Sequence, residues 1–180
     1  ICNIDFNSWK NRQVQLQCLN NIAHLQPSLP KKSSKKRIIL VRHGETDWNK
    51  QGRFQGQIDI PLNQNGKDQA KAARDFLKNI FIHKAFSSSL SRPRETAQII
   101  LEKHPGIEIS LKSNLKEIGH GKWEGKLETE IKSNWPDLLK TWKISPEKVQ
   151  MPEGENIRDV SNRSITGYLE ICKSLKEEET

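Results

Sequence analysis

The chain has 180 residues, enough for one domain with a hydrophobic core. Only 33% of them are hydrophobic, and no run of about 18 or more apolar residues occurs, which excludes a membrane-spanning helix. The net charge is +8, and five of the positive charges lie in the segment 31–37. The other 25 basic residues nearly balance the 22 acidic ones. The charge therefore does not indicate a surface for nucleic acid.

Three cysteines, Cys2, Cys18 and Cys172, are spread over the whole chain without a CxxC pair or a histidine at zinc-ligand spacing. This pattern excludes a disulfide scaffold and a zinc finger, and we expect no metal and no cofactor. The sequence shows no charged-then-apolar leader, so we expect a cytoplasmic protein. Because it begins at Ile1 and has its only methionine at position 151, we expect a fragment or a processed chain.

The first 37 residues, rich in Asn and Gln and ending in a Pro-containing and basic stretch, predict a linker or the tail of a preceding domain. The composition changes from polar and basic to apolar at Ile38. Residues 38–41 form a short apolar run typical of a strand buried on both faces of a parallel sheet. The run stops at Arg42-His43-Gly44.

Apolar spacing after this strand predicts a helix capped by Asn63, with Ala70 and Leu77 on its buried face. A second strand is expected near 84–87, a helix over 91–103, a third strand over 107–111 and a last helix over 156–176. Alternation of strands and helices is the signature of the α/β class. We therefore predict an α/β domain over residues 38–180.

Arg42 and His43 directly follow the first predicted strand, at the carboxyl edge where open α/β sheets place their ligands. A neighbouring guanidinium favours the neutral imidazole, which is the nucleophilic form. The same guanidinium can bind two oxygens of a phosphoryl group at once. Taken alone, His43-Gly44 is equally consistent with a structural turn.

Residues 40–49 (LVRHGETDWN) resemble the signature of the histidine phosphatase superfamily, which has the phosphoglycerate mutase-like fold. Further blocks match in the family's order: 52–56, 59–63, Gly66 with 69–70, 87–92, 96–97, 115–119 and 121–125. The resemblance implies a three-layer α/β/α sandwich with a mostly parallel sheet. The stretch from Glu117 to Asn156 is also similar to the second domain of cyanobacterial two-domain members and to plant 2-carboxyarabinitol 1-phosphate phosphatase-like proteins. Residues 1–37 resemble the linker that joins the two domains in the cyanobacterial members. This implies a phosphatase-like domain before residue 1.

The resemblance also implies roles for individual residues. His43 would become a phosphohistidine, and Glu117 would be the general acid and then the base. The phosphoryl oxygens would be held by Arg42, Asn49 and Arg92. Gln55 and Gly56 would line the substrate mouth. The implied activity is metal-independent hydrolysis of a small phosphorylated metabolite, such as a sugar phosphate or a phosphoglycerate-like compound.

Each role has an alternative. The alternatives are an ion pair with Glu95 for Arg92, a turn alone for Asn49, a surface carboxylate for Glu117 and a plain loop for residues 55–56. Of the domain's other histidines, we expect His120 to have a packing or pocket-wall role and His104 to lie at a helix end.

The block 123–125 (WEG) is similar to the phosphatase branch of the superfamily, which favours hydrolysis over phosphoglycerate mutase-type transfer. A noncatalytic phosphate-binding domain is the other alternative. The family's second catalytic histidine follows a strand after the last helix, and this sequence stops before such a strand. We therefore expect a domain truncated before its last core strand, with an incomplete active site.

Overall fold

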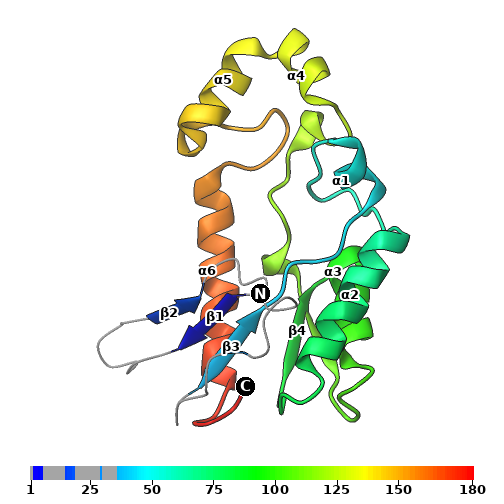
Figure 1. Cartoon of the computed structure of the whole chain (residues 1–180). Helices are drawn as coiled ribbons and strands as arrows, with labels where there is room; N and C mark the ends of the chain where they lie inside the picture. The colour runs from blue at the N-terminus through cyan, green and yellow to red at the C-terminus, as the bar shows by residue number, and fades with distance from the viewer. Residues whose placement is uncertain (1, 6–14, 19–28, 30–35) are drawn as a thin grey trace.

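The computed structural model describes residues 2–5, 15–18, 29 and 36–180 (Figure 1). Its strands are β1 (Cys2–Asp5), β2 (Gln15–Cys18), β3 (Arg37–Leu40), β4 (Ala85–Ser88) and β5 (Ile109–Lys112). Its α-helices are α1 (Asp47–Gln51), α2 (Gln64–Leu77), α3 (Ser91–Leu101), α4 (Glu128–Asn134), α5 (Pro136–Ile144) and α6 (Ile157–Ser174). Three short 3-10 helices cover Ser113–Leu115, Gly121–Trp123 and Pro146–Lys148.

Strands β4 and β5 pair in parallel and are joined by α3, which makes one β-α-β unit. Figure 1 shows α2 and α3 on one side of β3 and β4, and α6 on the other side. The predicted strands at 84–87 and 107–111 and the three predicted helices are confirmed, with ends shifted by a few residues. Asn63 caps α2 as expected, because its side chain accepts a hydrogen bond from the Gly66 amide at 2.9 Å.

The pairing of β3 differs from the expectation. The strand forms at Arg37–Leu40, but it pairs antiparallel with β1, which in turn pairs antiparallel with β2. Leu40 and Val41 are 46% and 36% exposed, so the expected burial on both faces was wrong. An apolar, β-branched run predicts a strand but carries no information about its partner.

Two strands, β1 and β2, lie before residue 38, where the sequence predicts only a linker. The segments CNID and QLQC do alternate apolar and polar residues, but each is only four residues long, and the surrounding Asn- and Gln-rich composition favoured a linker. Most of the expected linker, including the basic residues 31–35, lies outside the described residues. The division into a linker over 1–37 and a domain over 38–180 stays a prediction.

Apolar side chains gather in two places. One core joins the loop at 118–123 to α4, α5 and the chain before α6, and its buried members are Ile118, Trp123, Ile131, Leu139, Val149 and Met151. The other place is a cavity of about 330 Å³ between β3, β4, α3 and α6, with His43 among its lining residues. Over the residues that the structure describes, no helix combines the length and apolar character needed to cross a bilayer.

Candidate active site

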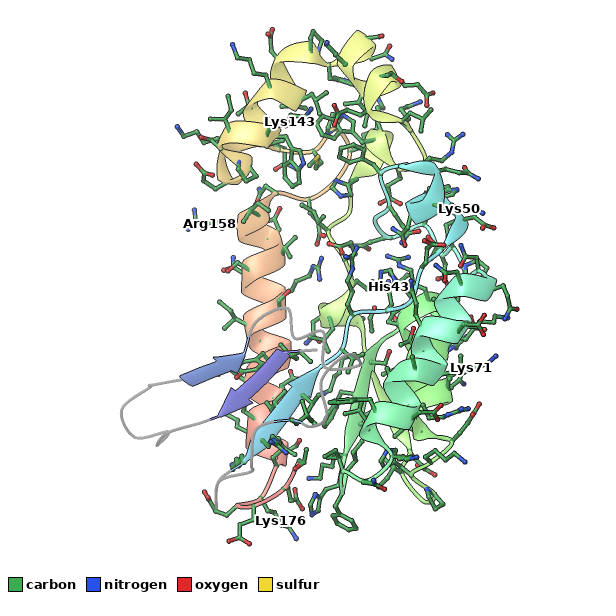
Figure 2. The ribbon with its side chains drawn as sticks, viewed as in Figure 1. His43, Lys50, Lys71, Lys143, Arg158 and Lys176 are labelled. Atoms are coloured by element: carbon green, nitrogen blue, oxygen red, sulfur yellow. The ribbon has the colours of Figure 1, made fainter. Side chains whose placement is uncertain are left out.

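The loop after β3 is held by close backbone packing. The amide of Gly44 donates to the hydroxyl of Thr96 on α3 at 3.1 Å, and that hydroxyl donates to the carbonyl of Arg92 at 2.8 Å. A Cβ at Gly44 would overlap the backbone of Gly66 at the start of α2. Only glycine allows this approach, which fixes the loop between α2 and α3. Figure 2 shows His43 on this loop, in the middle of the molecule below α1.

The hydrogen bonds of His43 define which ring nitrogen is free to react. Nδ1 lies 2.7 Å from the carbonyl oxygen of Gly44, which can only accept, so Nδ1 carries the proton. In the neutral ring, Nε2 then holds the lone pair. The Nε–H of Arg92 donates to this nitrogen at 3.4 Å. The structure therefore leaves the lone pair on Nε2 of His43 facing the guanidinium of Arg92.

The charge state of His43 fits a nucleophile. Burial lowers the pKa of His43 below its usual 6.5, and the nearby charges of Arg92 and Arg42 lower it further. The hydrogen bond to Gly44 and the carboxylate of Glu117 act in the opposite direction without reversing the shift. The imidazole is therefore neutral at pH 7.

We predict that His43 titrates below pH 6.5 in an NMR pH titration of its ring protons. The imidazolium forms only as the pH falls through this lowered pKa, so the lone pair on Nε2 persists into mildly acidic solution. Arg42→Gln removes a neighbouring positive charge and is expected to raise the pKa, whereas Glu117→Gln removes a negative charge and is expected to lower it further. A midpoint at or above 6.5, or shifts of the opposite sign, would contradict this account.

Arg92 is the most deeply buried charged group of the site, with 1% of its surface exposed. Besides its contact with His43, its Nη2 donates to the carbonyl of Gly56 at 2.6 Å and its Nη1 to the carbonyl of Ile58 at 3.3 Å. The alternative partner Glu95 instead pairs with Lys67 at 3.2 Å. Arg92 thus faces the histidine and supports the loop at 56–58.

Thr46 joins Asn49 and Gln55 to the N-terminus of α1. The backbone N–H of Asn49 donates to the Thr46 hydroxyl oxygen at 3.2 Å. The side-chain Oδ1 of Asn49 accepts from the backbone N–H of Thr46 at 3.1 Å, and the two bonds together form a capping box. Gln55 Oε1 lies 2.5 Å from the same hydroxyl. Asn49 therefore stabilises the local turn at the start of α1, as the alternative to phosphate binding expects. Its exposed side-chain NH₂ has no acceptor within residues 36–180, so its phosphate-binding role stays a prediction.

Gly56 is buried, and a Cβ there would overlap Glu124 and the carbonyl of Ile118. Its contribution is the backbone carbonyl that Arg92 binds. Glu117 and Arg42 are exposed, and both are close enough to His43 to act on its charge. The structure therefore brings together four of the predicted residues, His43, Arg42, Arg92 and Glu117. Contact of residues 55–56 with a substrate stays a prediction.

Two carboxylates that the sequence analysis quoted only within motifs turn out to organise the loops. Glu124 Oε1 accepts from the amides of Gln57 at 2.8 Å and His120 at 3.1 Å, and its Oε2 accepts from the amide of Ile58 at 2.6 Å. Asp59 Oδ1 accepts from both the amide and the hydroxyl of Ser91 at 2.7 Å, which caps α3. Apart from the His120 amide, their partners at Gln57, Ile58 and Ser91 are distant in the chain, and no local pattern identifies them.

The remaining histidines have structural surroundings. His120 packs edge-on against Phe54 and Trp142, with ring centroids 5.3 and 5.7 Å apart, which confirms the packing prediction. His104 is buried just after the end of α3, as expected for a helix end. In the part of the chain that the structure describes, no group of three or more His, Cys, Asp or Glu side chains is arranged to hold a metal.

Comparison of the sequence with known proteins shows the family of the chain. Residues 38–180 match the model of the histidine phosphatase superfamily (branch 1), so the chain belongs to this superfamily. It is 37% identical over 134 residues to phosphoserine phosphatase 1 of Hydrogenobacter thermophilus, covering 74% of this chain and 63% of that protein. It is 36% identical over 143 residues to the probable phosphoglycerate mutase GpmB of Escherichia coli, covering 78% of this chain and 64% of that protein.

Among solved structures, a mycobacterial glucosyl-3-phosphoglycerate phosphatase in complex with VO3 superposes with a TM-score of 0.66 at 32% identity, covering 73% of this chain and 65% of that chain. This likeness confirms the predicted phosphoglycerate mutase-like α/β fold. The chain spans less than two thirds of the length of the curated relatives described above.

Proposed function

We propose that this chain contributes to a phosphomonoester hydrolase that acts through a phosphohistidine at His43. The observation that carries the proposal is the tautomer of His43. Its Nδ1–H is tied to the Gly44 carbonyl at 2.7 Å, which leaves Nε2 unprotonated beside the guanidinium of Arg92. A histidine with only a structural role has no need of a lone pair directed at a buried cation.

In the first step, Nε2 of His43 attacks phosphorus, an N–P bond forms, and the ester P–O bond breaks. Glu117 gives its proton to the departing oxygen, which leaves as an alcohol. In the second step, water attacks phosphorus and gives a proton to Glu117, a P–O bond forms, the N–P bond to His43 breaks, and inorganic phosphate leaves. Both proton transfers return Glu117 and His43 to their starting states.

Positive charge around His43 suits this chemistry. Arg92 and Arg42 are both close enough to act on the charge of the ring, and the side-chain NH₂ of Asn49 is exposed on α1. Phosphoryl transfer depends mainly on positioning and on stabilising charge over the equatorial oxygens. We assign Arg42, Arg92 and Asn49 to these oxygens, and Gln55 and Gly56 to the mouth of the site.

We place the substrate among small phosphorylated metabolites such as sugar phosphates and phosphoglycerate-like compounds. The relatives include proteins named as a phosphoserine phosphatase, a glucosyl-3-phosphoglycerate phosphatase and a probable phosphoglycerate mutase. Two of these three names are phosphatases, and the WEG block at 123–125 also favours hydrolysis. Mutase-type transfer is the second candidate, favoured by the 36% identity to the mutase relative.

The test is a chemical trap of the intermediate. The full-length protein is mixed with a ³²P-labelled phosphomonoester, quenched within milliseconds, and divided between acid and alkali. We expect bound label that is lost in acid, retained in alkali and located on His43. Label transferred to an added phosphate acceptor, rather than to water, would indicate a mutase. Turnover without label, label that survives acid, or binding without either would contradict the proposal, the last in favour of a phosphate-binding domain.

A further inference from the structure

Arg163 on α6 has every one of its N–H groups engaged. Its Nε and Nη2 donate to the two carboxylate oxygens of Glu155, both at 2.7 Å, in a bidentate pair. The other three N–H groups reach backbone carbonyls: Nη1 donates to Asn114 at 3.1 Å and Lys116 at 2.6 Å, and Nη2 donates to Glu117 at 2.9 Å. A guanidinium has five N–H donors, and here five acceptors receive them.

Glu155 continues this network to the other side of Glu117. Its Oε2 accepts from the amide of Gly119 at 2.8 Å and from Nε2 of Gln57 at 3.1 Å. Gln57 also donates to the carbonyl of Glu117 at 3.2 Å. The hydrogen bonds from Arg163 lower the pKa of Glu155, with smaller contributions from Gly119 and Gln57. The carboxylate therefore remains ionised and keeps its acceptors at neutral pH.

These contacts fasten the backbone around Glu117 and leave its side chain out. The carbonyls of Lys116 and Glu117 and the amide of Gly119 are all held, whereas the Glu117 carboxylate accepts only from the amide of Ile118, at 3.0 Å, among the described residues. The carboxylate is exposed and acts on the charge of His43 and Arg92. If Arg163 served only to join α6 to this segment, it would not need three hydrogen bonds to carbonyls at residues 114–117, next to the Glu117 carboxylate.

We propose that Arg163 and Glu155 are positioning residues that fix the Glu117 carboxyl relative to His43, an inference that rests on the proposed role of Glu117 as general acid. The clamp consists of Arg163, Glu155 and Gln57. It acts on the main chain at 116–119, so the direction of the Glu117 side chain follows from the backbone, including the neighbouring Ile118 amide that it accepts from. A displacement of about 1 Å at a proton donor is enough to cost about 100-fold in rate.

The test compares two substrates of the full-length protein that differ in their need for an acid. An alkyl phosphate has a basic leaving oxygen that must be protonated, whereas p-nitrophenyl phosphate leaves without help. Arg163→Lys keeps the charge but cannot supply the five donors. In single-turnover experiments, we expect it to lower the rate of phosphohistidine formation from the alkyl phosphate by about 10- to 100-fold, and from p-nitrophenyl phosphate by less than about threefold.

Arg74 provides a matched control. Its side chain is 20% exposed, as is that of Arg163, and it pairs with Asp75 at 2.9 Å and Glu102 at 2.6 Å, on α2 and beyond α3. Arg74→Lys is expected to leave both rates unchanged. If Arg163→Lys is recovered unfolded, Glu155→Gln carries the same test, because the amide keeps the size and one oxygen acceptor.

Glu117→Gln separates failure of this inference from failure of the proposed function. We expect the same selective loss in Glu117→Gln, and no further loss when Arg163→Lys is added to it, since both changes remove one proton transfer. A selective loss in Glu117→Gln with none in Arg163→Lys overturns the clamp alone. Equal losses on both substrates in Arg163→Lys, accompanied by a lower melting temperature, also overturn it in favour of a purely structural tie. No effect in Glu117→Gln overturns the proposed acid together with the clamp.

Discussion

Replacing His43 with asparagine is expected to lower kcat on a phosphomonoester by on the order of 10⁴-fold or more, with little change in the melting temperature. The asparagine NH₂ can still donate to the Gly44 carbonyl, as Nδ1 of His43 does at 2.7 Å. The contact with Arg92, at 3.4 Å, is long and adds little stability. The substitution therefore removes the lone pair at Nε2 and leaves the loop in place. Steady-state kinetics and thermal unfolding of the full-length protein measure both effects.

His83 is a suitable control for this prediction. It is also half-buried, and its Nδ1 makes one backbone hydrogen bond, accepting from the amide of Thr180 at 3.1 Å. It lies beside β4, away from Arg92 and Glu117, so His83→Asn is expected to keep its full kcat. Activity of His43→Asn within tenfold of the parent protein, or an equal loss in His83→Asn, would show that His43 is not the nucleophile.

Local chemistry accounts for what the sequence predicted about the fold. The helix α2 was foreseen because Asn63 caps it and apolar side chains recur along one face, and both signals lie within a few residues of each other. The site at the end of β3 was foreseen because the motif and the strand are adjacent in the chain. His43 and Arg92 come from different elements, and only the family resemblance brought them together before the structure did.

The rest depends on contacts between distant segments, which no local pattern encodes. The partner of β3 is a strand some 35 positions earlier, and the run at 38–41 has the same composition whichever strand pairs with it. The carboxylate of Glu124 binds amides at 57 and 58, and Arg163 binds carbonyls 46 to 49 positions away. In the sequence, Arg163 is one more polar residue on an amphipathic helix, with no signal to distinguish it.

The loops of the site are joined to one another by buried or half-buried charges in addition to the packing of Phe54 against His120 and Trp123. Glu124 links the loop at 56–58 to the segment around His120, Arg163 and Glu155 link that segment to α6, and Arg92 links the same loop to His43. Such hydrogen bonds to charged groups are directional and hold a backbone in one position. They favour a preorganised site, which is the property that electrostatic stabilisation of phosphoryl transfer requires.

Arg92 is the residue on which most of this network converges, so its replacement is expected to affect stability and activity together. Arg92→Ala leaves the carbonyl of Gly56 without a donor among the described residues, and leaves the carbonyl of Ile58 with only the Ile60 amide, in a site where Arg92 is 1% exposed. It also removes the cation that faces the carboxylates of Glu117, Asp59 and Glu124. We expect the free energy of unfolding to fall by about 2–4 kcal/mol.

Activity distinguishes the phosphate-binding role of Arg92 from its structural one. Arg92→Lys keeps a positive charge but cannot donate to His43, Gly56 and the phosphoryl oxygens in the geometry of a planar fork. We expect kcat/KM to fall by about 100- to 1000-fold in Arg92→Lys, with a smaller loss of stability than in Arg92→Ala.

The control is Arg94→Ala, two residues along α3 and exposed, which is expected to change stability by less than about 0.5 kcal/mol. Urea unfolding followed by tryptophan fluorescence measures stability. A fully active Arg92→Lys would show that the guanidinium does not bind the phosphoryl group, and the role of Arg92 would then be limited to holding the loop at 56–58.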